Sequence, residues 1–308
     1  MTSSLVQSDK MQAYLDRIAG LGEAGGNART KQIVRRIVGD LFATIDDFDV
    51  SAEEFWGALH FLQKGAPEFG LIAPGLGFDH FLDVRMDIKD RAAAIVGGTP
   101  RTIEGPLYVP GAPLSKGFAR LDDGTDKGEV LVMSGTVRDA DGAPVAGAIV
   151  DVWHANTMGA YSVFDPSQSA YNNRRRIETD AEGKYRFHSI VPSGYSVPPA
   201  GATDTLLQAI GRHGNRPAHI HFFVSAPGYR HLTTQINIPG DPYLHDDFAF
   251  ATHDDLIPEV VRRTDPEAIH ANGLNAPFAE ILFDFALLKA TSEDDTRLMD
   301  RPRAMAVA

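Results

Sequence analysis

The spacing of hydrophobic positions changes near residue 105. Before that point, apolar side chains recur every three or four residues, as they do on one face of a helix. The clearest example is a series of four aliphatic residues spaced four positions apart, Ile33, Ile37, Leu41 and Ile45. Ser51 and Glu54 form an S-x-x-E capping box, which predicts that a helix begins there. A further helical pattern covers 80–96, and the Gly-Gly-Thr-Pro sequence that follows predicts its end.

After residue 105 the apolar residues alternate with polar ones, which is typical of strands. We expect strands at 129–139, 147–156, 184–192, 216–226, 231–238 and 278–288, with turns at 139–142 and 179–183. Short helices are expected near 203–211 and 254–263. Strands at this spacing favour an antiparallel sandwich or barrel. The sequence therefore predicts an α+β protein, with a helical N-terminal domain and linker at 1–104 and an antiparallel β-sandwich at 105–308.

Composition limits the classes of function. The 308 residues are 43% hydrophobic and 23% charged, as expected of a globular protein with a full core. The absence of cysteine excludes disulfides, cysteine-ligated zinc, iron–sulfur clusters and thiol nucleophiles. The net charge of −12, without a run of Lys and Arg, argues against nucleic acid as a partner. We find no long apolar stretch and no secretory signal, so we expect no membrane insertion and a cytoplasmic location.

Two histidines form the first candidate site. His219 and His221 lie two residues apart in an expected strand, so both imidazoles point to the same face. This arrangement is compatible with a metal-binding pair and equally with two ordinary strand histidines.

Two tyrosines and two polar neighbours extend this candidate site. Tyr161 and Tyr195 follow glycines in loops, where a side chain can be held over a rigid scaffold, although a single tyrosine is more often a packing residue. Phenolate is a hard, anionic ligand that suits ferric iron. Arg216 is interpreted either as a salt-bridge residue or as a fixed cation beside a metal-bound substrate, and Gln235 as a hydrogen-bonded strand residue or a site residue. The run from Arg174 to Arg176 predicts a solvated face.

Several segments together resemble one enzyme family. They are LIAPGLGFDHFLD, RTIEGPLYVPGAP, GAIVDVWHANTMGAYSVFD, RRRIETDAEGKYRFHSIVPSGY, GRHGNRPAHIHFFVSAPGYRHLTTQIN and GDPYLHDDFAFAT. Over nearly the whole length the chain resembles the intradiol ring-cleaving dioxygenases, and within them the catechol 1,2-dioxygenases. The resemblance implies one nonhaem Fe(III) per subunit, with Tyr161, Tyr195, His219 and His221 as ligands.

The resemblance also implies the roles of other residues. Tyr195 would leave the metal and act as a general base, while Arg216 and Gln235 would contact the substrate region. Arg216 would also help to bind the substrate, against an apolar wall formed by Leu71, Pro74, Ile103, Pro106, Leu107, Phe248 and Ala249. The implied reaction consumes catechol and O2 and gives cis,cis-muconate in the beta-ketoadipate route of aromatic degradation. A homodimer joined by the N-terminal helices, with a phospholipid at its interface, is implied as well.

Three alternatives stay open at this point. Hydroxyquinol or chlorocatechol could be the substrate, because a methyl or chlorine substituent changes binding in an apolar pocket by only about 1–3 kcal/mol. A lipid-binding β-sandwich protein without enzymatic activity would also explain the apolar helices and the strands. A hydrolytic zinc enzyme is the third alternative, although zinc sites rarely use paired tyrosines.

Overall fold

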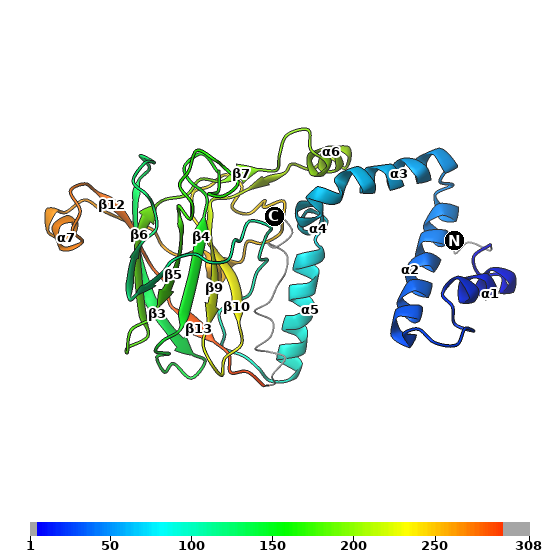
Figure 1. Ribbon diagram of the computed structural model, residues 1–308, viewed down its shortest axis with the longest axis horizontal. Coiled ribbons are helices and arrows are strands. Elements are labelled where there is room, and N and C mark those ends of the chain that lie inside the picture. Colours follow the sequence, from blue (N-terminus) through cyan, green and yellow to red (C-terminus); the bar gives the residue numbers. More distant parts are fainter. Residues whose placement is uncertain (1–4, 292–308) are drawn as a thin grey trace. The chain divides into compact units, whose positions relative to one another are not determined.

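The computed structural model describes residues 5–291 and divides into two compact units, with the boundary between Ala66 and Pro67. The predicted α+β class is confirmed (Figure 1). The boundary predicted at residue 104 marks the change of hydrophobic period, whereas the compact units divide earlier. The helices nearest to the sandwich in the sequence therefore belong to the second unit.

The first unit contains three helices, α1 (Asp9–Ile18), α2 (Ala28–Asp47) and α3 (Ala52–Gly65). The predicted capping box is confirmed at the start of α3. Ser51 Oγ accepts a hydrogen bond from the Glu54 amide at 3.2 Å, and the Glu54 carboxylate accepts one from the Ser51 amide at 2.9 Å. Helix α2 buries none of its twenty residues, so its apolar stripe stays exposed.

The second unit begins with two helices and a short turn. The 3-10 turn η1 (Ala66–Glu68) crosses the boundary and leads into α4 (Phe69–Gly75) and α5 (Phe78–Ala92). Helix α5 ends before the Gly-Gly-Thr-Pro sequence, as predicted. Asp90, near its end, accepts from Arg230 at 2.8 Å and also pairs with Arg101, which fixes α5 beside the sheet.

Two sheets form the sandwich (Figure 1). The five-stranded sheet has the order β1 (Leu114–Lys116), β5 (Arg174–Glu178), β4 (Ile149–His154), β9 (His219–Ser225) and β10 (Leu232–Asn237). The other has the order β11 (Val261–Arg263), β12 (Phe278–Leu282), β3 (Val130–Asp139), β6 (Lys184–Ile190) and β2 (Phe118–Arg120), with β13 (Phe285–Leu287) also on β3. A separate ribbon joins β7 (Tyr195–Ser196) and β8 (Asn215–Arg216).

The sheets are mixed rather than purely antiparallel. The central pairs β3–β6, β4–β5, β4–β9 and β9–β10 are antiparallel. Four other pairs, β1–β5, β2–β6, β12–β3 and β13–β3, are parallel. Long connections between these strands allow parallel pairing, which the alternation of residues within one strand does not reveal.

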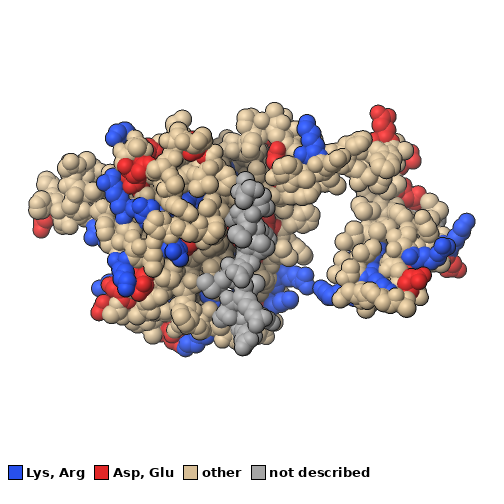
Figure 2. Space-filling view, viewed as in Figure 1, with Lys and Arg blue, Asp and Glu red and all other residues tan. Residues whose placement is uncertain are grey.

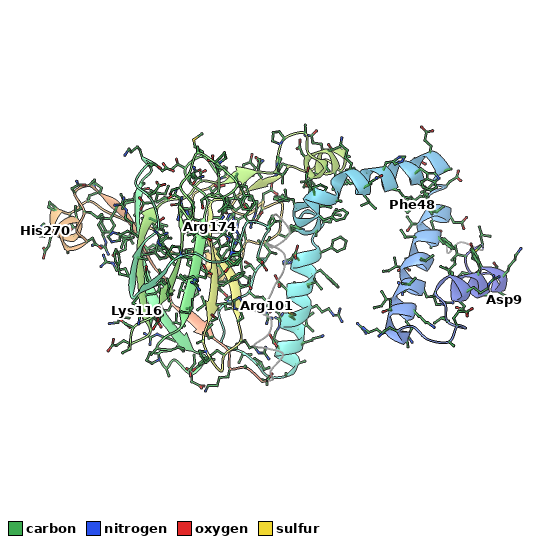
Figure 3. The ribbon with its side chains drawn as sticks, viewed as in Figure 1. Asp9, Phe48, Arg101, Lys116, Arg174 and His270 are labelled. Carbon is green, nitrogen blue, oxygen red and sulfur yellow. The ribbon has the colours of Figure 1, made fainter. Side chains whose placement is uncertain are left out.

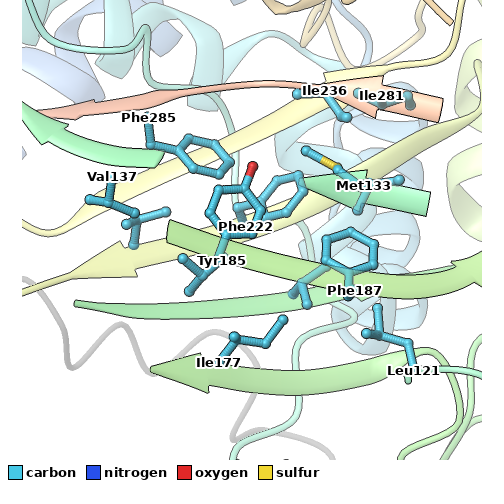
Figure 4. Packing of buried hydrophobic residues seen from close by; sticks show 14 of the residues in the cluster. Leu121, Met133, Val137, Ile177, Tyr185, Phe187, Phe222, Ile236, Ile281 and Phe285 are labelled. Carbon is cyan, nitrogen blue, oxygen red and sulfur yellow. The ribbon is translucent and has the colours of Figure 1, made fainter. Parts of the chain in front are cut away.

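The main core lies between the two sheets and explains how the sandwich positions a site (Figure 4). Phe222 and Ile220 of β9 are fully buried there, packed with residues such as Met133 and Phe187 of the opposite sheet. Side chains on a strand alternate between its faces. Because Ile220 and Phe222 point into this core, His219 and His221 point to the outer face of the five-stranded sheet, as the strand prediction required.

Other local predictions had mixed outcomes. The short helix expected near 203–211 is confirmed as α6 (Ala202–Ala209). The helix expected at 254–263 is wrong, because only the 3-10 turn η2 (Asp254–Leu256) forms and β11 follows it. Helix α7 (Pro266–Ala271) was not predicted, although Asp265 caps it and a proline begins it.

The predicted solvated face at Arg174 is also wrong, because this side chain comes from β5 and lies buried in the second unit (Figure 3). Small groups of Lys and Arg and of Asp and Glu are scattered over the visible face, among the described residues (Figure 2). None of the described helices has the length and apolar character to cross a membrane.

Candidate metal centre

His219 and His221 direct their Nε2 atoms toward the same point, 3.0 Å apart. The Nδ1 atom of His219 lies 2.6 Å from the Pro217 carbonyl oxygen, which can only accept. Nδ1 therefore carries the proton, and Nε2 presents a lone pair. Arg216 Nη1, also 3.0 Å from Nε2, donates to that lone pair. Two cis ligands with metal–nitrogen bonds of about 2.1 Å would be separated by about 3.0 Å, so the spacing fits a shared metal ion.

The two predicted tyrosines lie beside this pair. Tyr161 lies in the loop after β4 and is 3% exposed, whereas Tyr195 is half-buried in β7. The Tyr161 and Tyr195 rings meet edge to face at 5.6 Å, and the Tyr195 and His219 rings lie 5.5 Å apart. The structure thus brings all four predicted ligands together, from a loop, the β7–β8 ribbon and β9.

Burial and charge shift the pKa values of these groups. Burial, reinforced by neighbouring Tyr195, raises the pKa of Tyr161 well above its ordinary value. Burial together with Arg216 lowers the pKa of His219 to about 3, and burial with His219 lowers the pKa of His221. The site therefore favours neutral imidazoles and, without a cation, neutral phenol at Tyr161. A metal cation would reverse the second preference, because it stabilises phenolate.

Arg216 is held by two acceptors behind the histidines. Its guanidinium contacts Asp247 at 3.0 Å and donates from Nη2 to Gln235 Oε1 at 2.8 Å. Burial alone would lower the pKa of Arg216, but Asp247 and the tyrosines raise it above its ordinary value. Burial likewise would raise the pKa of Asp247, but Arg216 lowers it. Arg216 is therefore a permanent cation in a fixed position at the centre.

Gln235 reaches this network from β10, where it lies directly opposite His221 on β9. It is fully buried, and its Nε2 donates to Asn237 Oδ1 at 3.2 Å. Both interpretations of Gln235 therefore hold, because it is a hydrogen-bonded strand residue and also contacts Arg216 at the candidate site.

The predicted apolar wall gathers around α4 and the loop after β10. Ile103, Phe248 and Ala249 belong to one buried cluster, and Leu107 packs against another that contains Tyr161. Leu71 and Pro74 lie on α4. Glycines on either side of them show how closely this helix packs, since a Cβ at position 70 would lie 2.9 Å from Pro106 and one at position 75 would lie 3.2 Å from Phe248.

Three buried residues at the centre were missed by the sequence analysis. Asp247 pairs with Arg216, and Trp153 stacks on His221 with 4.9 Å between ring centroids. Arg174 lies over the Tyr161 ring at 5.7 Å and donates to Ser162 Oγ and to the Ser162 carbonyl. Burial lowers the pKa of Arg174 to about 10, although Tyr161 opposes this effect. In the sequence, only the charge of Asp247 and Arg174 could have pointed to a site. Charged residues are common on surfaces, so that charge does not distinguish these two.

The donor set restricts the kind of metal. Among residues 5–291, no group of three or more His, Cys, Asp and Glu side chains is arranged to hold a metal ion. A two-histidine, one-carboxylate Fe(II) site or a histidine-rich zinc site therefore has no counterpart in the described part of the chain. Two phenols and two neutral imidazoles fit a hard trivalent cation better.

Comparisons with known proteins point in the same direction. A family model described as "Dioxygenase" matches residues 103–289, and one described as "Catechol dioxygenase N terminus" matches residues 27–94. Catechol 1,2-dioxygenase of Acinetobacter baylyi is 52% identical over 98% of this chain and 99% of its own length. Catechol 1,2-dioxygenase 2 of Acinetobacter lwoffii is 64% identical over 81% of this chain and 92% of its own. The solved structure of catechol 1,2-dioxygenase from Pseudomonas arvilla C-1 has a TM-score of 0.92 at 52% identity, covering 99% and 100% of the two chains.

Enzymes named for other substrates match less well. Hydroxyquinol 1,2-dioxygenase of Rhizobium sp. is 34% identical over 85% of this chain and 90% of its own. Chlorocatechol 1,2-dioxygenase of Rhodococcus opacus is 42% identical, but over only 52% of this chain and 63% of its own.

Proposed function

The chain belongs to the intradiol ring-cleaving dioxygenase family, and from this membership we propose that it cleaves catechol between its two hydroxyl-bearing carbons with O2, giving cis,cis-muconate. The observation that carries the proposal is the meeting of Tyr161, Tyr195, His219 and His221 around one buried point. Lipid binding by a β-sandwich protein would not require these four side chains to lie together, and a zinc hydrolase would use other ligands.

We assign a nonhaem Fe(III) to this point, one per subunit. The two tyrosines would supply negative charge as phenolates, and the two histidines would bind through Nε2 as neutral donors. When bound, ferric iron supplies a Lewis acid for both catechol oxygens and makes the electron-rich ring susceptible to O2. The Nδ1–H···Pro217 hydrogen bond of His219 supports this role, because it keeps the ligating nitrogen unprotonated.

Tyr195 is the better candidate for the general base. A catechol that binds through both oxygens must lose two protons. A protein group that accepts one of these protons has to change its position or its protonation state. Tyr195 is half-buried in a two-residue strand, whereas Tyr161 is enclosed and lies under Arg174. The more accessible phenol would therefore be the group that accepts a catechol proton and holds it at its oxygen.

Arg216 would stabilise the negative charge that develops on the ring and its oxygen substituents. Asp247 and Gln235 hold its guanidinium in place before the substrate arrives, so little reorganisation is needed during the reaction. The buried surroundings strengthen this effect, because the dielectric constant there is lower than in water.

The apolar wall supports catechol over hydroxyquinol. A third hydroxyl group facing Leu71, Ile103 or Ala249 would lose its hydrogen bonds to water without gaining a partner from these side chains. Steady-state rates with catechol, 4-chlorocatechol and hydroxyquinol test this choice, and a clear preference for hydroxyquinol would reverse it.

One experiment tests the whole proposal. Purified protein loaded with ferric iron should show a visible phenolate-to-iron band, and anaerobic catechol should change that band stoichiometrically. Admission of air should then yield the dicarboxylate, identified by NMR. A colourless protein that binds zinc, or a coloured one that leaves catechol intact, would contradict the proposal. Tyr14→Phe, at an exposed position of α1, serves as the control for tyrosine replacement.

The partner assignments are proposals as well. The exposed apolar residues Ile33, Ile37 and Leu41 of α2 support a homodimer joined through the N-terminal helices, and a phospholipid would cover apolar surface in the same region. Light scattering on the purified protein tests the dimer, and mass spectrometry of an organic extract tests the lipid. We also propose a cytoplasmic location, which fractionation of the source cells would test.

A further inference from the structure

The two candidate histidine ligands are held in different ways. His219 donates from Nδ1 to Pro217, which fixes the plane of its ring. The Nδ1 atom of His221 is also buried, but it has no hydrogen-bond partner among the described residues. Histidines that bind metals almost always donate their other N–H to an acceptor, which orients the ring. Some other contact must therefore orient His221.

That contact is a stack with Trp153. Trp153 on β4 lies directly opposite His221 on β9, and their ring planes differ by only 6°, with centroids 4.9 Å apart. Trp153 is 1% exposed, and its indole N–H is buried without a partner among the described residues. The indole thus makes no hydrogen bond there, and what it presents to His221 is a flat face.

Two other aromatic rings border the indole, and of these Tyr108 has a hydrogen-bonded anchor of its own. Phe223 meets Trp153 edge-on at 4.7 Å, and Tyr108 does so at 4.9 Å. The Tyr108 hydroxyl donates to Asp151 at 2.9 Å. Burial raises the pKa of Asp151 to about 6, although the Tyr108 hydrogen bond opposes this shift. Asp151 and Trp153 point to the same face of β4, so one strand supplies both the stacking ring and the anchor for its neighbour.

We infer that Trp153 is the positioning residue for His221, and that stacking on the indole replaces the hydrogen bond that this ligand lacks. The inference rests on the metal site of the proposed function. Without the indole, the imidazole can rotate about its side-chain bonds, so Nε2 spends less time directed at the metal. The residue acts through His221 and does not contact the substrate or the reacting atoms.

Trp153→Leu removes the flat face and keeps an apolar side chain, whereas Trp153→Phe keeps a smaller ring. The matched control is Phe223→Leu, which removes an aromatic ring from the same cluster (Trp153, Ala155, Tyr161 and Phe223) but not from the His221 stack. In each iron-loaded protein we would measure bound iron and its rate of release to a chelator. Trp153→Leu should release iron about 10- to 100-fold faster than the parent, with Trp153→Phe between them and Phe223→Leu close to the parent.

A second measurement needs no metal. In the metal-free protein, the indole should shift the Cε1–H NMR signal of His221 through its ring current, and Trp153→Leu should abolish the shift while Phe223→Leu preserves it. Parent-like iron release in Trp153→Leu would overturn the inference, and so would release from Phe223→Leu that is as fast as release from Trp153→Leu. A His221 signal that does not move when Trp153 is replaced would overturn it as well. A parent protein that binds no iron would instead contradict the proposed function. If Trp153→Leu does not fold, the Trp153→Phe and Phe223→Leu pair still decides the outcome.

Discussion

The phenol rings of Tyr161 and Tyr195 stand nearly perpendicular, with 89° between their planes and 5.6 Å between their centroids. The two residues differ in their surroundings, because Tyr161 is 3% exposed beneath Arg174 whereas Tyr195 is half-buried in the β7–β8 ribbon. Two chemically identical candidate ligands are therefore expected to perform different tasks.

Replacement of each tyrosine by phenylalanine should separate these tasks. Tyr161→Phe removes the candidate ligand that we propose to stay anionic, so the visible band should be lost or greatly weakened and bound iron should decrease about 10- to 100-fold. Tyr195→Phe should retain iron and a band at a changed wavelength, while kcat falls about 10²- to 10⁴-fold, as expected for the loss of a general base. Iron analysis, visible spectra and kinetics would be compared with Tyr14→Phe. An unchanged spectrum with full activity in Tyr161→Phe would falsify the ligand assignment.

The ion pair between Arg216 and Asp247 gives a second prediction. Both side chains are almost fully buried, so Asp247→Asn leaves a buried guanidinium without its counter-charge. Breaking such a pair costs roughly 3–5 kcal/mol of unfolding free energy. Chemical denaturation should show this loss, and kcat should fall because Arg216 is no longer fixed.

Two further variants separate stability from catalysis at this pair. Asp246→Asn, at the exposed neighbouring position, should change neither quantity by much. The double replacement Arg216→Met and Asp247→Leu should recover most of the stability but none of the activity, because it removes both buried charges together. Recovery of activity in this double variant would exclude Arg216 from the reaction.

The sequence could predict those parts of the fold and site that depend on local periodicity. His219 and His221 share a face because strands alternate, and Ser51 with Glu54 marks a helix start because the capping box is a local hydrogen-bond pattern. Whether two strands run parallel or antiparallel, in contrast, depends on how distant segments of the chain pair. The helix expected at 254–263 failed for the same reason, since Val261–Arg263 pairs with Phe278–Leu282.

The missed site residues had no distinguishing local pattern. Asp247 follows another aspartate in a polar loop, and only folding brings it to Arg216, 31 positions earlier. Arg174 belongs to a run of three arginines that is typical of a solvated face, yet folding buries it against Ser162 and the Tyr161 ring. Trp153 received no interpretation from the sequence, because its role depends on its register with His221 across two strands.

Glu68 provides a third prediction, which concerns the apolar wall. Its carboxylate accepts hydrogen bonds from the Ala202 amide at 3.0 Å and from the Thr203 amide at 2.8 Å, at the start of α6. Helix α6 carries Leu207, which packs in the same cluster as Phe248. Glu68→Ala should therefore cost about 1 kcal/mol, as for a lost helix cap, and should raise KM for catechol more than it lowers kcat. Glu53→Ala, on the exposed side of α3, is the control. An unchanged KM would separate α6 from substrate binding.

The last prediction concerns the dependence of stability on pH. His154 joins the two sheets, because its Nδ1 donates to the Ala155 carbonyl at 2.7 Å and its Nε2 accepts from Ser189 of β6 at 2.7 Å. Burial lowers the pKa of His154 to about 4, against an ordinary value of 6.5. Between these two values the unfolded chain binds a proton that the folded protein does not. The free energy of unfolding therefore falls as pH decreases from about 6.5 to about 4.

The contribution of His154 can be isolated by difference. One such group changes the free energy of unfolding by at most about 1.4 kcal/mol per pH unit in this interval, or roughly 3 kcal/mol in all. His154→Gln removes the titrating group, so urea denaturation of the metal-free variant should show a shallower pH slope than the parent, whatever its absolute stability. His270→Gln, at an exposed position on α7, should keep the parental slope. The raised pKa of Asp151 acts in the opposite direction but is common to all three proteins, so it cancels in the comparison. Equal slopes in His154→Gln and the parent would mean that folding leaves the pKa of His154 at its ordinary value. That result would contradict the burial and hydrogen bonding of this side chain.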